Sequence, residues 1–144
     1  MTQRRLIYQL NVARHALMKS MDQACKQALN ISAVQLSALM VLNERNGCLM
    51  KDLASALMLD KSALTSLARR MQEADLIERL SCESDSRAAR LKITARGNRI
   101  LNQGLALLRQ ANKDITRGFS EDELDTVSRF LSHLTVQFSK DADV

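Results

Sequence analysis

The chain has 144 residues, of which 46% are hydrophobic and 26% charged, and it contains no proline. This length fits one domain with a substantial apolar core, and the composition argues against a proline-rich linker. The net charge is +5, but residues 118–144 carry six acidic and two basic side chains, so the preceding chain has a net charge of +9. Such an excess attracts polyanions or covers an ordinary solvated surface, and charge alone does not choose between them.

No apolar run approaches the roughly 20 residues that a membrane span needs, and residues 1–15 carry scattered charges instead of a signal-peptide core. We therefore expect a cytoplasmic protein with no membrane partner. The three cysteines, Cys25, Cys48 and Cys82, are far apart and form no C-x-x-C pattern. This spacing argues against a zinc knuckle and against a disulfide framework, and we expect no metal and no other cofactor.

The N-terminal part of the chain is predicted to form two helices. Over residues 6–28 apolar side chains recur every three or four positions, which is the period of an amphipathic helix. Ser32 is followed three residues later by Gln35, the spacing of a capping box, and this pair predicts a second helix that runs to about residue 43. The dipeptide at 46–47, Asn-Gly, then predicts a turn.

Two shorter helices are expected next. The apolar positions between residues 50 and 57 lie on one helical face, and Asp60 is a natural N-cap for a further helix over residues 61–75. The apolar stripe of this further helix consists of Leu64, Leu67, Ala68 and Met71. Its other face is polar without being acidic and carries Ser62, Thr65, Ser66 and Arg69. The apolar stripe is typical of a core-facing surface, and the polar face is either solvated or a binding surface.

The segments "LIERLSC" (residues 76–82) and "ARLKIT" (residues 89–94) alternate apolar and polar side chains with the period of a β-strand. Ser and Asp in the connecting "ESDSRA" favour a turn, so we expect a two-stranded hairpin with Arg87 at its tip. Between residues 84 and 99 only Asp85 opposes a group of basic side chains, namely Arg87, Arg90, Lys92, Arg96 and Arg99. The hairpin is therefore predicted to be basic.

Two long helices are predicted for the C-terminal part of the chain. Thr94 is expected to cap a helix from about residue 95 to residue 117, and Ser120 with Glu123 forms a second capping box that opens a final helix. The apolar side chains of the final helix keep a heptad-like rhythm at Leu124, Val127, Leu131, Leu134 and Phe138. Core packing within one chain and pairing between two chains both explain this rhythm.

Two short helices joined by a tight turn are typical of a helix-turn-helix. Hydroxyl side chains and an arginine on its second helix can enter the major groove, where arginine bonds guanine and a threonine methyl contacts thymine. A basic hairpin that follows can place an arginine in the adjacent minor groove while its neighbours contact phosphates. The predicted fold class is therefore mainly α, a winged helix-turn-helix with a two-stranded β-hairpin wing and long helices at both ends of the chain.

Several motifs resemble the MarR family of bacterial transcriptional regulators, and the resemblance covers nearly the whole chain. "DSR" at residues 85–87, the strand "RLKIT" and then "ARG" at residues 95–97 are similar to the family's D-x-R wing and to the L-T-x-x-G start of its next helix. "SCESDSRAARLKIT" is particularly similar to the SlyA branch of the family. "LDKSALTSLARRMQEADLIER" resembles the family's recognition helix and its exit into the wing.

The resemblance implies a homodimeric regulator that binds double-stranded DNA at a pseudo-palindromic operator, with half-sites about one helical turn apart. It assigns residues 32–94 to a winged-helix lobe, and it assigns residues 1–31 and 95–144 to a dimerisation lobe built from the long terminal helices. Asp85 would orient the wing by pairing with an arginine, for which Arg70 is our candidate. The candidate DNA contacts are Lys61, Ser62, Thr65, Ser66, Arg69, Arg87 and Arg90.

The sequence departs from the family pattern at three positions. Met58 and Asp75 stand in turns where the family often has glycine, and methionine tolerates a left-handed backbone poorly. Ser86 stands before Arg87, where the family often has a basic residue. This last departure predicts a weaker phosphate contact at the wing.

The resemblance also suggests what such a regulator would sense. Many relatives respond to small aromatic acids, which makes Arg14 and His15 on the first helix candidates for binding a carboxylate effector. Other relatives sense oxidants through a cysteine. Cys82 in the wing and Cys48, close to a helix end where a thiol can be exposed, are the candidates, whereas Cys25 lies on an apolar stripe and is expected to be buried. An ordinary packed or solvated role is the alternative for each of these residues.

An enzyme is not expected, because the sequence holds no nucleophile elbow, no Gly-rich phosphate loop and no His-x-x-x-His ligand pair. The main alternative to a DNA-binding regulator is a helical module that docks on another protein and never contacts DNA. The basic hairpin favours DNA binding, because a protein-docking module has no need of Arg87 beside a face of hydroxyls and arginine.

Overall fold

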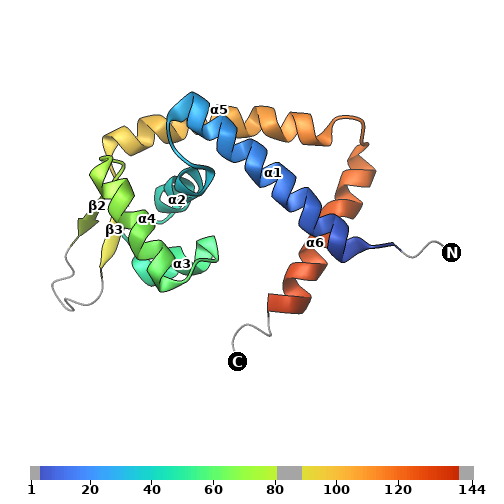
Figure 1. Ribbon diagram of the computed structural model, residues 1–144, viewed down its shortest axis with the longest axis horizontal. Coiled ribbons are helices and arrows are strands. Elements are labelled where there is room, and N and C mark those ends of the chain that lie inside the picture. Colours follow the sequence, from blue (N-terminus) through green and yellow to red (C-terminus); the bar gives the residue numbers. More distant parts are fainter. Residues whose placement is uncertain (1–3, 81–88, 140–144) are drawn as a thin grey trace. The chain divides into compact units, whose positions relative to one another are not determined.

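The computed structural model describes residues 4–80 and 89–139, which form six helices and three short strands (Figure 1). The chain divides into two compact units, an N-terminal unit (Met1–Leu108) and a C-terminal unit (Arg109–Val144), and α5 continues from the first into the second. In chain order the elements are α1 (Leu6–Leu29), α2 (Ala33–Glu44), β1 (Cys48–Leu49), α3 (Met50–Leu57), α4 (Lys61–Glu73), β2 (Ile77–Leu80), β3 (Arg90–Ile93), α5 (Ala95–Thr116) and α6 (Glu121–Ser139).

The junction of α1 and α2 shows how local sequence ends one helix and begins the next. Ser32 and Gln35 form the predicted capping box, since the Gln35 N–H donates to Ser32 Oγ over 3.2 Å and the Ser32 N–H donates to Gln35 Oε1 over 3.0 Å. Asp22 on α1 accepts from the Ala33 N–H at 3.0 Å and pairs with Lys26 at 2.9 Å. The hydrogen bond from Lys26, and then the bond from Ala33, lower the pKa of the Asp22 carboxyl. The first turn of α2 therefore receives a cap from its own sequence and another from α1.

The turn between α3 and α4 is closed by a residue that is unusual for its backbone conformation. Met58 has φ 55° and ψ 41°, the left-handed region, and its side chain is 91% exposed. The Met58 N–H donates to the Ser55 carbonyl at 3.2 Å, and the Leu59 N–H donates to the Ala54 carbonyl at 2.9 Å, which together make a Schellman motif. Asp60 then caps α4, its carboxylate accepting from the Ala63 N–H at 2.7 Å. The predicted cap and turn are confirmed. The turn places methionine in a left-handed backbone conformation, which glycine adopts with the least strain.

Replacing Met58 with glycine is expected to raise the free energy of unfolding by about 1 kcal/mol, because the left-handed conformation is strained for a residue with a Cβ. Little burial is lost, since the side chain is almost fully exposed. Urea unfolding at one fixed protein concentration measures the change. Met18→Gly is the matched control: Met18 is 44% exposed within α1, where glycine lowers stability. A loss of stability in both variants contradicts strain at Met58.

The three strands form one small antiparallel sheet in the order β1-β3-β2. β2 and β3 pair with Ile77 opposite Ile93 and Leu80 opposite Arg90, which confirms the predicted hairpin strands. A third strand that the sequence did not predict, β1, pairs with the other edge of β3, with Cys48 opposite Leu91. A strand of two residues shows no alternation along the sequence, and only its partner reveals it.

The core of the N-terminal unit lies where α2, α4 and the sheet meet, and α1 and α5 contribute to it through their ends nearest α2 and β3 in the chain. The side chains that are 0–2% exposed include Leu36, Leu39, Leu42, Leu53, Leu64, Leu67, Ala68, Met71, Leu76, Leu91 and Leu101. The four predicted apolar residues of α4 are all among them. One face of α4 thus packs in the core, and the opposite face points outward.

Long helices contribute unevenly to burial. Residues 11–20 of α1 are all exposed, and no residue of α6 within its described range is buried. The exposed large apolar side chains in these helices include Ile7, Tyr8, Val12, Leu17, Val127, Leu131, Val136 and Phe138. Across residues 4–80 and 89–139 no single helix is long and apolar enough to cross a membrane, although α1 and α2 meet the length and hydropathy requirement when joined across their 78° bend.

Candidate nucleic-acid interface

The outward face of α4 is the centre of the candidate interface. Ser62, Thr65 and Arg69 are exposed and Ser66 is half-buried, whereas the apolar stripe on the opposite side is at most 2% exposed. Lys61 is exposed at the start of the same helix. The predicted polar face is therefore present as one continuous helical surface, held in place by the packing of the other side.

The side chains of this face make weak contacts that another partner could replace. Thr65 Oγ1 donates to the Lys61 carbonyl at 2.8 Å, which leaves its methyl group available for contact. Arg69 pairs with Glu73 at 3.6 Å, but both side chains are about two-thirds exposed, and ion pairs of this kind contribute little stability. Arg69 can therefore leave Glu73 for a base edge or a phosphate at small cost.

Arg70 and the wing tip were predicted to act together. The structure places Arg70 at an exposed position of α4, where its Nε donates to the Ser66 carbonyl over 3.4 Å. The proposed partner Asp85, the tip residue Arg87 and the candidate thiol Cys82 all lie outside the described residues. The pairing of Arg70 with Asp85 stays a prediction.

Arg90 was expected to contact DNA, and the structure gives it a contact within the protein. Its Nη1 donates to the Gly47 carbonyl at 2.8 Å and thereby ties β3 to the turn before β1. The Met50 N–H donates to the Ala89 carbonyl at 3.1 Å beside this contact. Arg90 is still exposed, so it anchors the start of β3, where the strand pairs with Leu80, and still contributes positive charge there.

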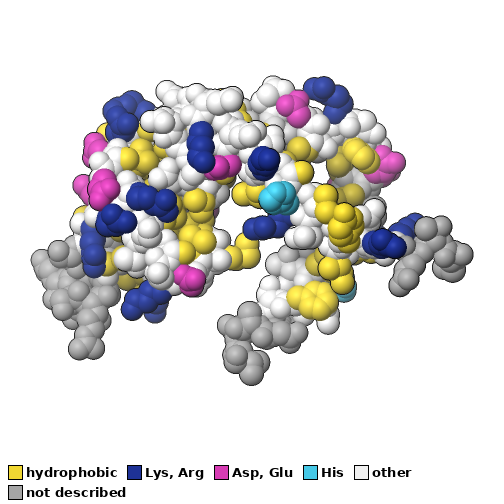
Figure 2. Space-filling model, viewed as in Figure 1, with side chains coloured by type: hydrophobic (Ala, Val, Ile, Leu, Met, Phe, Trp, Pro, Cys, Tyr) yellow, Lys and Arg dark blue, Asp and Glu magenta, His cyan; other side chains and the backbone are white. Residues whose placement is uncertain are grey.

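Positive charge surrounds these elements. Figure 2 shows Lys and Arg side chains over α4 and the strands of the N-terminal unit, with Asp and Glu side chains among them. The exposed basic residues on these elements include Lys61, Arg69, Arg70, Arg79 and Arg90. Asp60, Glu73, Asp75 and Glu78 are exposed acids on or beside the same elements, so the face is basic without being uniformly so.

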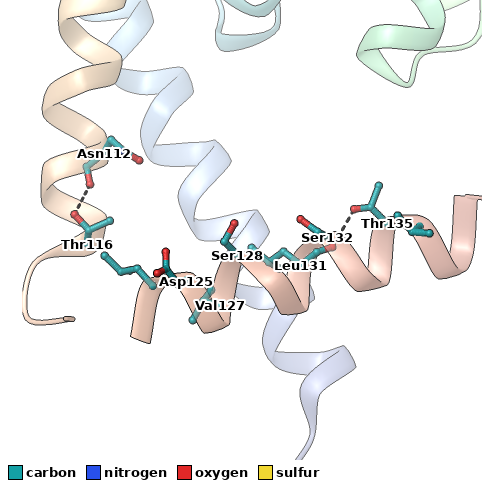
Figure 3. A pocket seen from close by; sticks show the side chains of 10 residues that line it. Asn112, Thr116, Asp125, Val127, Ser128, Leu131, Ser132 and Thr135 are labelled. Carbon is teal, nitrogen blue, oxygen red and sulfur yellow. Dashed lines mark hydrogen bonds between the residues drawn. The ribbon is translucent and has the colours of Figure 1, made fainter. Parts of the chain in front are cut away.

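The candidate effector residues Arg14 and His15 are both exposed on α1. A groove of about 770 Å³ lies elsewhere, within the C-terminal unit between the end of α5 and α6 (Figure 3). Neither residue lines this groove, whose walls carry hydroxyls as well as aliphatic side chains. Thr116 and Thr135 donate to carbonyls of their own helices, at 2.8 Å and 3.1 Å, so these two hydroxyls are already engaged.

The described cysteines are poorly suited to sensing oxidants. Cys25 is fully buried, as predicted, and Cys48 is only 6% exposed, which corrects the expectation that its place near a helix end would expose it. Cys48 is covered because β1 pairs with β3 in the sheet. Burial raises the pKa of both thiols, and the nearby carboxylates of Asp22 and Asp52 raise them further. The reactive thiolate is thus disfavoured at both sites.

Among residues 4–80 and 89–139 no three His, Cys, Asp or Glu side chains are grouped so that they could hold a metal ion.

Two structural contacts near the interface escaped prediction from the sequence. The Thr94 hydroxyl bonds the Asp75 carbonyl as well as capping α5, and Gly97 packs directly on Leu76. Thr94 and Gly97 are visible in the sequence as a helix start, but their contacts with the end of α4 are visible only in the fold.

A helix-turn-helix followed by a hairpin and flanked by long helices defines the winged-helix class. The fold resembles that of S. aureus MepR in complex with DNA, with 20% identity over 94% of this chain and 100% of that chain and a TM-score of 0.87. The transcriptional regulator SlyA matches with 19% identity over 96% of each chain and a TM-score of 0.87. A variant of E. coli MarR complexed with operator DNA matches with 24% identity over 89% of this chain and 94% of that chain and a TM-score of 0.77.

At these identities the structural matches establish the likeness of the fold. In the sequence itself, residues 31–89 match the model of the MarR family. This matched segment begins just before α2, includes the helix-turn-helix and β2, and ends just before β3. The chain thus has the fold of these winged-helix structures, and its residues 31–89 match the MarR family model.

Proposed function

We propose that this protein is a transcriptional regulator that binds double-stranded DNA as a homodimer at a pseudo-palindromic operator. The observation that carries the proposal is the division of α4 into a fully buried apolar stripe and an outward face of hydroxyls and arginine. Such a face fits the major groove, where arginine reads guanine and threonine contacts a thymine methyl group. Lys61, Ser62, Thr65, Ser66 and Arg69 are the proposed contacts on α4.

The hairpin supplies the second part of the proposed interface. Arg87 would enter the minor groove beside the base-reading helix, with Asp85 orienting it through Arg70. Arg90 supports this arrangement from the start of β3, because its bond to Gly47 fixes that end of the strand. The net charge of +9 before residue 118 favours association with DNA. The likeness to MepR and MarR structures that contain DNA supports the same proposal.

Homodimerisation is proposed from the exposed apolar side chains of α1 and α6. A solvated helix with Val127, Leu131, Val136 and Phe138 between 45% and 65% exposed presents a surface that a second copy can cover. We assign residues 1–31 and 95–144 to the dimerisation lobe and residues 32–94 to the DNA-binding lobe. Two-fold symmetry would then present two α4 helices to half-sites about one turn of DNA apart.

We further propose that a small aromatic acid or an oxidant modulates DNA binding and that the regulator acts as a cytoplasmic repressor. Arg14 and His15 are exposed and available to a carboxylate ligand. For an oxidant, the burial of Cys48 leaves Cys82 as the candidate thiol. Binding assays with salicylate and with peroxide separate the two forms of control.

A helical protein-docking module is the competing proposal, and selection of bound sequences from a random duplex library distinguishes the two.

Arg69→Ala is expected to relax base preference at one position, at a cost of about 1–3 kcal/mol for the preferred base. Arg87→Ala is expected to lower affinity with less effect on sequence choice. Arg129→Ala on α6 is the control, because it removes the same charge far along the chain from α4. Binding should weaken steeply with added salt. A library that yields no preferred sequence with the unmodified protein contradicts the proposal.

A further inference from the structure

Thr94 lies between the last strand and α5, and three of its hydrogen bonds connect the turn after α4 with the first turn of α5. Its hydroxyl donates to the Asp75 carbonyl at 2.7 Å and accepts from the Gly97 N–H at 3.0 Å. Its own N–H donates to the Leu76 carbonyl at 3.1 Å. One residue therefore bonds both the turn that follows α4 and the first turn of α5. We call these three bonds the Thr94 clasp.

The carbonyls that Thr94 holds are fixed to the end of α4. Asp75 has φ 57°, and its N–H donates to the Gln72 carbonyl at 3.0 Å. The Leu76 N–H donates to the Met71 carbonyl at 2.9 Å, which completes a Schellman motif. Met71 is 1% exposed, so this end of α4 is locked into the core. The hydrogen bond from Thr94 to the Asp75 carbonyl therefore holds the C-terminal end of α4.

The first turn of α5 packs in direct contact with the turn that follows α4. A Cβ on Gly97 would lie 2.2 Å from the Leu76 carbonyl oxygen and 2.8 Å from Ile93 Cγ1. The backbone of α5 thus packs directly on the segment that Thr94 bonds. The clasp and this close approach together leave little freedom for α5 to rotate against α4.

We propose that the Thr94 clasp sets the direction of α4 relative to α5 and thereby determines the half-site spacing that the dimer selects. The proposal rests on the DNA-binding function proposed above. α5 continues from the clasp to Thr116, about 30 Å at the rise of an α-helix. A change of about 10° at the clasp moves the far end of such a helix by about 5 Å, which exceeds the roughly 3.4 Å between successive base pairs. A small change of angle at Thr94 therefore moves the far end of α5 by more than the distance between two base pairs.

Thr94 is a positioning residue in this proposal. Substitutions that keep its cap of α5 but remove its bond to Asp75 separate the two roles. Thr94→Ser keeps a hydroxyl that both donates and accepts. Thr94→Asp keeps a good cap for α5, because a carboxylate accepts from the Gly97 N–H, but it cannot donate to the Asp75 carbonyl. Thr94→Gly retains most of the stability of a helix N-cap and has no side chain to bridge the two helices.

The experiment measures affinity for a series of duplexes in which the selected half-sites are moved apart or together by one and two base pairs. The unmodified protein, Thr94→Ser and the control Thr126→Ala are expected to prefer one spacing by at least about tenfold. Thr126 Oγ1 donates only within α6, to the Asp122 carbonyl at 3.0 Å, so its loss leaves the clasp intact. In Thr94→Asp and Thr94→Gly the ratio of affinities for the best and neighbouring spacings is expected to fall at least fivefold, while base preference within a half-site is kept.

The ratio cancels any uniform effect of charge or stability on binding, and circular dichroism identifies variants that are folded. Thr94→Gly replaces Thr94→Asp if the carboxylate prevents folding. The clasp is refuted if either folded variant keeps the spacing preference of the unmodified protein, or if Thr94→Ser loses it. If the unmodified protein selects no duplex sequence or no spacing, the proposed DNA-binding dimer fails instead.

Discussion

Substitution of Gly97 by alanine is expected to lower the free energy of unfolding by about 2 kcal/mol, although alanine is the better helix former. The added Cβ would lie 2.2 Å from the Leu76 carbonyl oxygen, a backbone atom that also accepts the Thr94 N–H. The Leu76 carbonyl cannot move away easily, since Leu76 is 1% exposed and its N–H bonds the Met71 carbonyl at the end of α4. Urea unfolding at one fixed protein concentration measures the change.

Gly104→Ala is the matched control within the same helix. A Cβ on Gly104 would meet the Leu36 side chain, with Cδ1 at 2.4 Å, and no backbone atom is among the three nearest. A leucine side chain can change its rotamer, and alanine gains roughly 1 kcal/mol of helix propensity, so the net cost should be clearly smaller than at Gly97. Equal losses of stability in the two variants would show that the Leu76 carbonyl is not what excludes a side chain.

The elements that the sequence predicted well are those specified by local signals. Ser32 with Gln35, and Ser120 with Glu123, form capping boxes as expected, since each pair needs only a spacing of three residues. Asp60 caps α4 for the same reason. The core face of α4 follows from helical periodicity, and all of its predicted members are buried.

The features that escaped prediction depend on residues far apart in the chain. β1 is too short to show a period, and it exists because Cys48 and Leu49 pair with Leu91 and Arg90. The burial of Cys48 is a consequence of that pairing. Arg90 likewise finds its partner at Gly47, which no motif near residue 90 indicates. The sequence predicted the two hairpin strands correctly, but it could not indicate that Arg90 contacts the protein itself.

The candidate interface was predictable to the extent that one helix forms it. Ser62, Thr65 and Arg69 share a face because of their spacing, and the structure exposes all three. The contribution of Arg87 belongs to a segment outside the described residues, so its role stays a prediction. How α4 is held was not predictable, because the Thr94 hydroxyl acts across a separation of 19 residues from Asp75.

Leu131→Glu on α6 is expected to convert the dimer to monomers and to lower affinity for a two-half-site operator by at least about a hundredfold. Leu131 is 45% exposed on a helix with no buried residue in its described range, and it lines the groove between α5 and α6. A two-fold interface contains the substitution twice, so a cost of about 2 kcal/mol per copy becomes about 4 kcal/mol, nearly a thousandfold in the dimer dissociation constant. Sedimentation equilibrium measures that constant.

His133→Glu tests whether charge alone explains such a loss. It introduces the same carboxylate into α6, but two residues along an α-helix place it on the opposite side from Leu131. We expect this variant to stay dimeric and to bind the operator with only a small electrostatic loss. Both variants should bind an isolated half-site with similar, weak affinity, because neither changes the face of α4 that carries Thr65 and Arg69. A Leu131→Glu protein that stays dimeric at micromolar concentration would exclude this face of α6 from the dimer interface. If it became monomeric yet bound the full operator as tightly as before, DNA recognition would not depend on dimerisation.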